Sequence, residues 1–304
     1  MRQGGCFLDP ARRRRQREIL TILSSTGEVV WPLPPTRTPL TANLMRITDT
    51  DIALAIALAD AAGAAIRPHF RAPFDVEIKE DASPVTIADR AAEQAMRALL
   101  AAEAPRDGIS GEEFGTTEGS TGRQWVLDPI DGTRAFIAGR PLFGTLIALV
   151  IDGWPAIGII DHPILKERWV GAVGRQTLFN GKPAATRACP DLSHALLATT
   201  SPALFDDSQL HAFEHLDSAV RSTLLGGDCY NYATLASGWL DLVVEAGLKL
   251  HDFAALVPVI EGAGGRMCDW SGDPLTAASN GEVIAAGDPA RVEEVLEALA
   301  CRGD

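Results

Sequence analysis

Residues 125–136 read WVLDPIDGTRAF, a short apolar strand pattern that runs into two aspartates, Asp128 and Asp131. The aspartates lie three residues apart around a proline, so we expect both carboxylates at the same end of the strand. Two such carboxylates repel each other unless a divalent cation joins them, and magnesium prefers oxygen ligands of this kind. The segment therefore predicts a metal site at a strand end, although a lone Asp-x-x-Asp-Gly string is also typical of a capped turn.

The two residues that follow Asp131 extend this predicted site. Gly132 and Thr133 stand at the start of a predicted short helix. Backbone N–H groups at a helix start bind anions such as a phosphate oxygen. Metal and phosphate are therefore expected to meet at one turn.

Two further acidic segments lie at the boundaries of predicted elements. Glu112 follows a short strand in the run Gly-Glu-Glu at 111–113, and Asp252 opens an apolar helix in the run LHDFAA at 250–255. Taken alone, Glu112 is an ordinary loop acid and Asp252 an ordinary helix N-cap. Three acidic segments placed in this way favour one site that collects carboxylates.

Residues 45–187 predict an N-terminal α+β lobe. Apolar residues predict a helix from about Thr48 to Phe70, with Asp49 or Thr50 as its N-cap, and helical spacing predicts a second helix over 87–102. Alternating and apolar runs predict the strands of an antiparallel sheet at 75–79, 124–127, 142–151, 156–162 and 167–173.

Residues 188–304 alternate between strand and helix patterns, which predicts a second, α/β lobe. The expected strands are 195–199, 240–245, 266–269 and 282–286. The expected helices are 208–216, 230–237, 252–262 and a closing helix from 289.

Residues 1–44 differ from the rest in charge and pattern. They hold seven arginines and three acids, against 20 basic and 37 acidic residues in the remaining 260. Four prolines at 31–39 and the lack of a helical or strand period predict a tail outside the fold. The alternatives are an upstream start codon with Met45 as the true start, or a basic run that binds nucleic acid or acts as an address.

The composition of all 304 residues, 46% hydrophobic with a formal charge of −13, excludes general disorder. The negative charge argues against a nucleic-acid partner, because phosphates would be repelled. No apolar run is long enough to span a bilayer, so no membrane partner is expected. The five scattered cysteines favour a reducing cytoplasm and no zinc site; they are Cys6, Cys189, Cys229, Cys268 and Cys301. Cys229 has no adjacent histidine in the sequence that would activate it.

The order of GEE at 111–113, DPIDGT at 128–133 and HDFA at 251–254 resembles the inositol monophosphatase-like phosphatases, from about Thr50 to Arg302. The resemblance implies a layered αβαβα sandwich of α+β and α/β character, with metal ions between two lobes. It also implies a phosphate monoester as the small-molecule substrate, water as the nucleophile, and a homodimer.

The resemblance also implies a ligand set for two or three magnesium ions. Glu112, Asp128 and the carbonyl oxygen of Ile130 would hold the first ion. The second would be held by Asp128, Asp131 and Asp252. A weaker third ion would use Glu112 and waters.

The segment SPVTIAD at 83–89 matches the family element in which an acid prepares the attacking water. By resemblance, Asp89 would orient and deprotonate that water together with Thr133. An acid in the first turn of a helix, stabilised by the helix dipole, is the alternative interpretation of Asp89.

Within the family, four segments resemble the histidinol-phosphate phosphatase branch: 140–150, 198–202, 226–233 and 243–265. Histidinol phosphate carries an ammonium and an imidazole, which Asp228 and Glu245 can receive by charge-assisted hydrogen bonds. Ser201 and Gly227 match the polar substrate-contact segments. A helix cap at Asp228 and an ordinary Ser-Pro turn at Ser201 are the alternatives.

These observations predict a cytoplasmic, magnesium-dependent phosphatase that converts L-histidinol phosphate to L-histidinol and phosphate, a late step of histidine biosynthesis. A phosphatase for inositol or aminocyclitol phosphates is the alternative enzyme. A regulatory binding protein that keeps the phosphatase fold is the alternative of another class.

Overall fold

The computed structural model describes residues 47–73, 76–78 and 84–300, so the predicted tail at 1–44 lies outside the described residues. All described residues belong to one compact unit that begins at Ile47. The two main sheets of this unit fall on either side of residue 187 in the sequence. The division into an N-terminal and a C-terminal lobe at that point stays a prediction.

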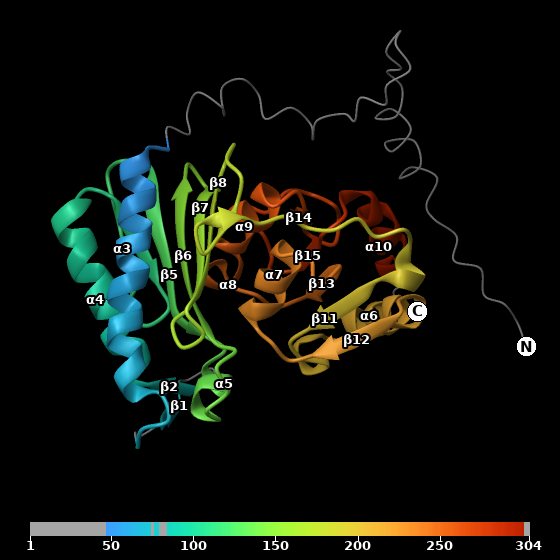
Figure 1. Cartoon of the computed structure of the whole chain (residues 1–304), viewed down its shortest axis with the longest axis horizontal. Helices are drawn as coiled ribbons and strands as arrows, with labels where there is room; N and C mark the ends of the chain where they lie inside the picture. The colour runs from blue at the N-terminus through green and yellow to red at the C-terminus, as the bar shows by residue number, and fades with distance from the viewer. Residues whose placement is uncertain (1–46, 74–75, 79–83, 301–304) are drawn as a thin grey trace, which may run out of the picture. The chain divides into compact units, whose positions relative to one another are not determined.

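Two long helices, α3 (Asp49–Ile66) and α4 (Ile87–Glu103), pack against each other, and α3 contacts β6 and β7 of the large sheet (Figure 1). The predicted N-cap of α3 is wrong by one or two residues. Thr48 is the cap, because its hydroxyl accepts a hydrogen bond from the N–H of Asp51, while the Asp51 carboxylate accepts the N–H of Thr48. A short 3₁₀ turn, η1 (Arg67–His69), follows α3.

The large sheet has eight strands in the order β10-β9-β8-β7-β6-β5-β3-β4. Its pairs are antiparallel, as predicted, except that β3 and β5 run parallel, which was not predicted. The chain reverses from β3 into β4 and then crosses to the other side of β3 to form β5. The strands are β3 (Gly108–Gly111), β4 (Gly115–Thr117), β5 (Arg123–Asp131), β6 (Gly144–Ile151), β7 (Trp154–His162), β8 (Glu167–Ala172), β9 (Leu178–Phe179) and β10 (Lys182–Pro183).

The second sheet has five strands in the order β12-β11-β13-β15-β14, in which β11 pairs parallel with both β12 and β13. The edge strand β12 was not predicted from the sequence. The strands are β11 (Leu196–Thr199), β12 (Ser222–Leu225), β13 (Leu242–Glu245), β14 (Arg266–Cys268) and β15 (Val283–Ala286). A separate two-stranded sheet pairs β1 (Val76–Ile78) with β2 (Pro84–Thr86).

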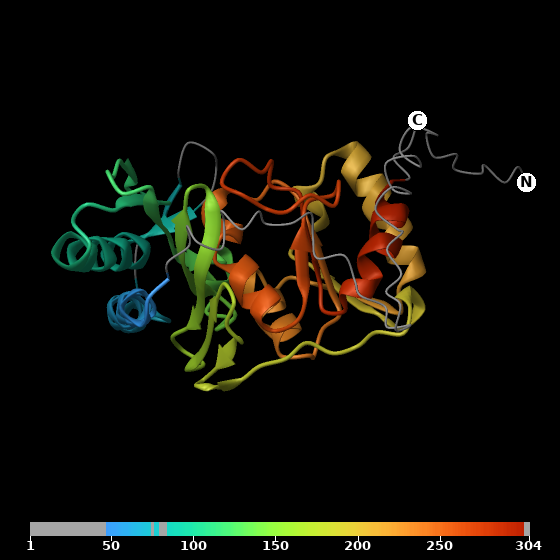
Figure 2. The same ribbon diagram turned by 90° about the horizontal axis from the view of Figure 1, so that it is seen from above.

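A short helix, α5 (Thr133–Ile137), contacts β2, and five other helices form a layer between the two main sheets and a layer beyond the second one (Figures 1 and 2). The helix predicted at 252–262 is broken in two, because Pro258 cannot donate a hydrogen bond to the carbonyl four residues earlier. The middle layer holds α7 (Cys229–Ala236), α8 (Leu250–Phe253) and α9 (Leu256–Gly262), and the outer layer holds α6 (Asp207–Ala219) and α10 (Val292–Leu299).

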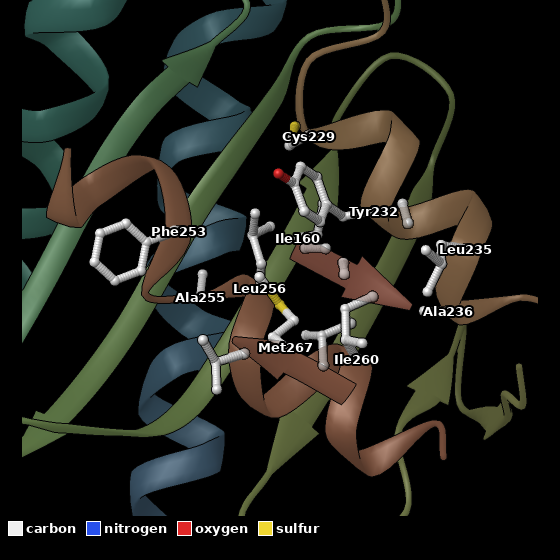
Figure 3. Close-up of a cluster of buried hydrophobic side chains, with 14 of the residues drawn as sticks. Ile160, Cys229, Tyr232, Leu235, Ala236, Phe253, Ala255, Leu256, Ile260 and Met267 are labelled. Carbon is white, nitrogen blue, oxygen red and sulfur yellow. The ribbon is translucent and has the colours of Figure 1, made fainter. Parts of the chain in front are cut away.

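The middle helices bury an apolar cluster against both sheets. Tyr232, Leu256 and Ile260 are almost fully buried in it, next to Ile160 of β7 and Met267 of β14 (Figure 3). A cluster of this kind contributes about 1.5–3 kcal/mol for each large side chain that it removes from water. The layers therefore follow the order α, β, α, β, α, which confirms the predicted layered sandwich.

Candidate active site

The metal segment predicted from the sequence ends strand β5 in a fixed turn. Asp128 still pairs with Leu146 of β6, but the register then shifts, so that Asp131 pairs with Gly144. The Asp128 carboxylate accepts the N–H of Ile130 at 3.0 Å. The hydroxyl of Thr145 donates to the carbonyl of Pro129 at 2.8 Å. These bonds hold the irregular backbone that turns both aspartates toward one point.

Three aspartates from two distant segments converge at this turn. Asp128, Asp131 and Asp252 each offer a carboxylate oxygen, and these oxygens lie within 4.8 Å of one another. Asp252 comes from α8, where its carboxylate accepts the N–H of Lys249 at 2.7 Å. It is therefore the third residue of that helix, and its interpretation as the N-cap is wrong.

Glu112 joins this group from the parallel strand next to β5. It directly follows β3, and its N–H donates to the carbonyl of Leu127 at 3.1 Å. Its charge helps to raise the pKa of both Asp128 and Asp252. Because the carboxyl ends of two parallel neighbours lie at the same edge, the β3–β5 pair places Glu112 beside the aspartates.

The electrostatics of the group fit a divalent cation. Burial is the main cause that raises the pKa of Asp128 and of Asp131 well above the ordinary value, and repulsion from nearby carboxylates adds to it. Burial also raises the pKa of Asp252. A bound divalent cation would instead favour the charged carboxylates, and magnesium prefers a donor set made only of oxygen atoms. We therefore propose that Glu112, Asp128, Asp131 and Asp252 hold magnesium.

Asp89 lies fully buried in the first turn of α4. One of its carboxylate oxygens accepts both the N–H and the hydroxyl of Thr86, at 2.8 and 2.6 Å. The other oxygen is also buried and has no hydrogen-bond partner among the described residues. Burial, helped by the charge of Glu112, raises the pKa of Asp89 to about 6. Asp89 is thus an acid of the first helical turn, as the alternative interpretation has it. Only one of its two carboxylate oxygens takes part in the bonds to Thr86.

Thr133 and Ile130 contact each other in the turn. The Thr133 hydroxyl donates to the Ile130 carbonyl oxygen at 3.0 Å, which is the oxygen predicted to bind metal. Gly132, between the aspartate and this threonine, has φ 88°, a conformation that favours glycine. The roles of Ile130 as a ligand, of Gly132 and Thr133 as phosphate binders, and of Asp89 with Thr133 as the water-activating pair stay predictions.

Asp228 lies directly against this turn. A β-carbon added to Gly132 would stand 2.9 Å from the Asp228 carboxylate. Asp228 has φ 48° and ψ −138°, which is rare for a residue other than glycine, and its side chain makes no hydrogen bond that caps α7. Asp228 therefore occupies the N-cap position of α7, as the alternative interpretation has it, but its carboxylate does not cap the helix. Burial raises the pKa of Asp228, while the nearby Arg134 lowers it.

The other predicted substrate-binding residues follow the carboxyl ends of adjacent strands. Gly227 has φ 114° and follows β12. Ser201 follows β11, and its hydroxyl accepts the N–H of Ala203 at 3.2 Å, so the Ser-Pro turn is present. Glu245 is only 3% exposed, and its two oxygens accept the N–H of Thr200 at 2.8 Å and the hydroxyl of Tyr232 at 2.9 Å. A substrate group that binds Glu245 would have to do so while the carboxylate still accepts the hydrogen bonds of Thr200 and Tyr232.

Two residues at the site escaped sequence analysis. The N–H of Cys229 donates to Asp131 at 2.6 Å. Its sulfur and the ring of His162 both face Gly144, where an added β-carbon would lie 2.6 Å from Cys229 Sγ and 2.9 Å from His162 Cε1. The pair lies 67 positions apart in the sequence, so only the fold brings them together. Burial lowers the pKa of His162 to about 4, so this histidine is neutral near pH 7.

Comparison with known proteins places the chain in a family. The model of the inositol monophosphatase family matches residues 48–303. The chain is 50% identical over 266 residues to a chloroplastic bifunctional phosphatase, IMPL2, of Arabidopsis thaliana, across 83% of this chain and 77% of that protein. It is 36% identical over 256 residues to a histidinol-phosphatase of Mycobacterium tuberculosis, across 82% of this chain and 97% of that protein.

Solved structures agree with this placement. An inositol monophosphatase from Zymomonas mobilis has 58% sequence identity and a TM-score of 0.77, across 83% of this chain and 98% of that one. The chain therefore belongs to the inositol monophosphatase family, and it is a phosphatase of that family. In the described part of the chain, no helix has the length and apolar character needed to cross a membrane.

The raised pKa values predict how magnesium and pH act together on stability. A carboxyl whose pKa is raised on folding contributes stability that is present below its unfolded pKa and lost as pH rises through the folded value. The proposed ligands Asp128, Asp131 and Asp252 all have raised pKa values, mainly because of burial, so their charges destabilise the metal-free fold as the pH rises. Because magnesium replaces the lost protons, we expect it to raise the melting temperature more at about pH 8 than at about pH 5.5.

Differential scanning fluorimetry with magnesium or EDTA measures this difference. The Asp128→Asn variant is the control, since it removes one carboxylate from the group and should reduce the magnesium effect at the higher pH. A magnesium effect of equal size at both pH values would contradict the proposed metal site.

Proposed function

We propose that the chain is a magnesium-dependent phosphatase that hydrolyses L-histidinol phosphate, as a late step of histidine biosynthesis. The convergence of Asp128, Asp131 and Asp252 supports the hydrolytic part of this proposal. The acid Asp228 beside the phosphate turn supports a cationic substrate. The relatives named histidinol-phosphatase, at 35–37% identity, point in the same direction. A cytoplasmic location and a homodimer also stay proposals.

The chemistry of the reaction assigns work to several residues. Bound magnesium would neutralise the phosphate oxygens and make the attacking water more acidic. Asp89 offers a buried, unbonded carboxylate oxygen that can orient this water and accept its proton, and a pKa of about 6 suits a general base. The N–H groups of Gly132 and Thr133 would hold the phosphate at the same turn.

Recognition of the rest of the substrate falls to the second sheet. Asp228 follows strand β12 and lies against the metal turn, and Glu245 is the last residue of β13; β11 pairs with both of these strands. A buried acid, Glu245, and a half-buried one, Asp228, are not needed for magnesium, and they favour a ligand that brings positive charge of its own. The ammonium and imidazole of histidinol phosphate meet that requirement.

An inositol or aminocyclitol phosphate is the second candidate substrate. The observation that favours it is the 58% identity with a solved protein named inositol monophosphatase. The metal group serves either substrate, since phosphate is common to both.

Phosphate release from a substrate panel tests the proposal directly. We expect histidinol phosphate to be hydrolysed with a kcat/KM at least about tenfold above that of inositol 1-phosphate, since one well-made charged contact is worth about that factor. Activity should vanish with EDTA. A magnesium-dependent preference for inositol 1-phosphate would replace the substrate proposal, and no release from any ester would favour a binding protein that keeps the fold.

The Asp128→Asn variant tests the metal group. We expect kcat to fall at least about a hundredfold, because Asp128 is proposed to bind both ions. In EDTA the same variant should melt at a higher temperature than the wild type, since one repelling buried carboxylate is gone. Circular dichroism confirms that the fold is kept. Undiminished turnover would show that the metal assignment is wrong.

The Asp228→Asn variant tests substrate recognition. Loss of the charge should raise KM for histidinol phosphate about tenfold, and KM for a neutral polyol phosphate much less. Asp217→Asn is the matched control, because Asp217 is exposed on α6 in the outer layer. Equal changes of KM for both substrates would remove the argument from charge.

A further inference from the structure

A buried glutamate on α4 holds the turn that carries Glu112. Glu93 is fully buried, and its carboxylate accepts the N–H of Glu113 at 2.7 Å and the N–H of Phe114 at 3.2 Å. Each of its oxygens thus binds a backbone group directly after Glu112. A buried carboxylate with this many donors is costly to desolvate but strongly directional.

The glycine before Glu112 is required by the same contact. A β-carbon added to Gly111 would stand 1.9 Å from an oxygen of Glu93, so no other residue fits there without moving the glutamate. Packing against Glu93 therefore explains why a glycine stands at position 111, before the two glutamates. The sequence alone did not indicate this contact.

Arg97, one turn later on α4, completes the attachment. Its Nε donates to Glu93 at 2.7 Å, which provides the charge that the buried carboxylate needs. One terminal nitrogen donates to the hydroxyl of Thr117 at 3.2 Å, and the other donates to the carbonyl of Gly115. The arginine therefore binds the far side of the same turn, at strand β4.

The turn is thus fixed from two directions. On one side the N–H of Glu112 is bonded to Leu127, at the end of the strand that carries the aspartates. On the other side Glu93 and Arg97 hold the next five residues against α4. The same helix carries Asp89, four residues before Glu93 and fully buried on the same face. One helix thereby places the proposed base and one proposed ligand.

We propose that Glu93 is a positioning residue for magnesium, which sets the place of Glu112 relative to Asp128 without touching the metal itself. This inference rests on the proposed metal group. Residues that orient metal ligands through hydrogen bonds typically change metal affinity about 10- to 100-fold when they are replaced.

The Glu93→Gln variant tests this role. The amide keeps the size of the side chain, but its NH₂ group cannot accept the hydrogen bonds that the second carboxylate oxygen accepts. We expect the magnesium concentration for half-maximal activity to rise about tenfold, and Mn²⁺ binding, followed by electron paramagnetic resonance, to weaken by about the same factor. At saturating magnesium, kcat and the KM for substrate should stay within about threefold of the wild type.

The controls separate positioning from loss of fold. Glu103→Gln changes an exposed glutamate at the end of the same helix and should leave Mn²⁺ binding unchanged. If Glu93→Gln does not fold, Arg97→Lys provides the second test, because it keeps a positive charge for Glu93 but loses the contacts to Thr117 and Gly115. It should weaken Mn²⁺ binding in the same direction.

Two results would overturn the inference. One is Mn²⁺ binding that is unchanged in folded Glu93→Gln, or in Arg97→Lys where the first variant does not fold. The other is a loss of kcat that high magnesium does not restore, which indicates a general structural role. Mn²⁺ binding is measured without substrate. The test of Glu93 therefore remains valid even if the chain does not hydrolyse phosphate esters.

Discussion

Repulsion among buried carboxylates is the constraint on which the site depends. Asp128 is repelled by the charges of Glu112, Asp131 and Asp252, and burial makes the charges of the three aspartates more costly still. Such a group persists only where the surrounding fold provides more stability than the group removes. The apolar layer of α7, α8 and α9 between the two sheets supplies that stability directly behind the site.

The topology explains how residues far apart in sequence reach one point. The parallel pairing of β3 with β5 brings Glu112 to the end of the strand that carries Asp128. The shift of register after Asp128 turns Asp131 to the same side, and α8 adds Asp252 from the C-terminal half. Each contribution is a local irregularity: a crossover, a bulge and a broken helix. Regular strands and helices alone would have separated these carboxylates.

Much of this arrangement could be predicted from the sequence, for physical reasons that differ between elements. The helix around Met96 and the strand that carries Asp128 have clear apolar patterns, so their type was predictable. The break before Pro258 required only the chemistry of proline, yet the apolar run concealed it. The approach of Cys229 and His162 to Gly144 and the contacts of Glu93 had no local signal, because both depend on the packing of separate elements.

The position of Asp228 separates substrate choice from chemistry. Its carboxylate lies against Gly132 and raises the pKa of Asp131, but it comes from the start of α7 and from a backbone conformation that is unfavourable for aspartate. A strained acid beside an acidic metal group costs stability twice, and the nearby Arg134 offsets only part of this cost, since the pKa of Asp228 stays raised by burial. A cationic substrate group would relieve the second cost. Asp228 belongs to a segment that is separate from the metal segments in the sequence, so substrate recognition can change there while the proposed metal group stays the same.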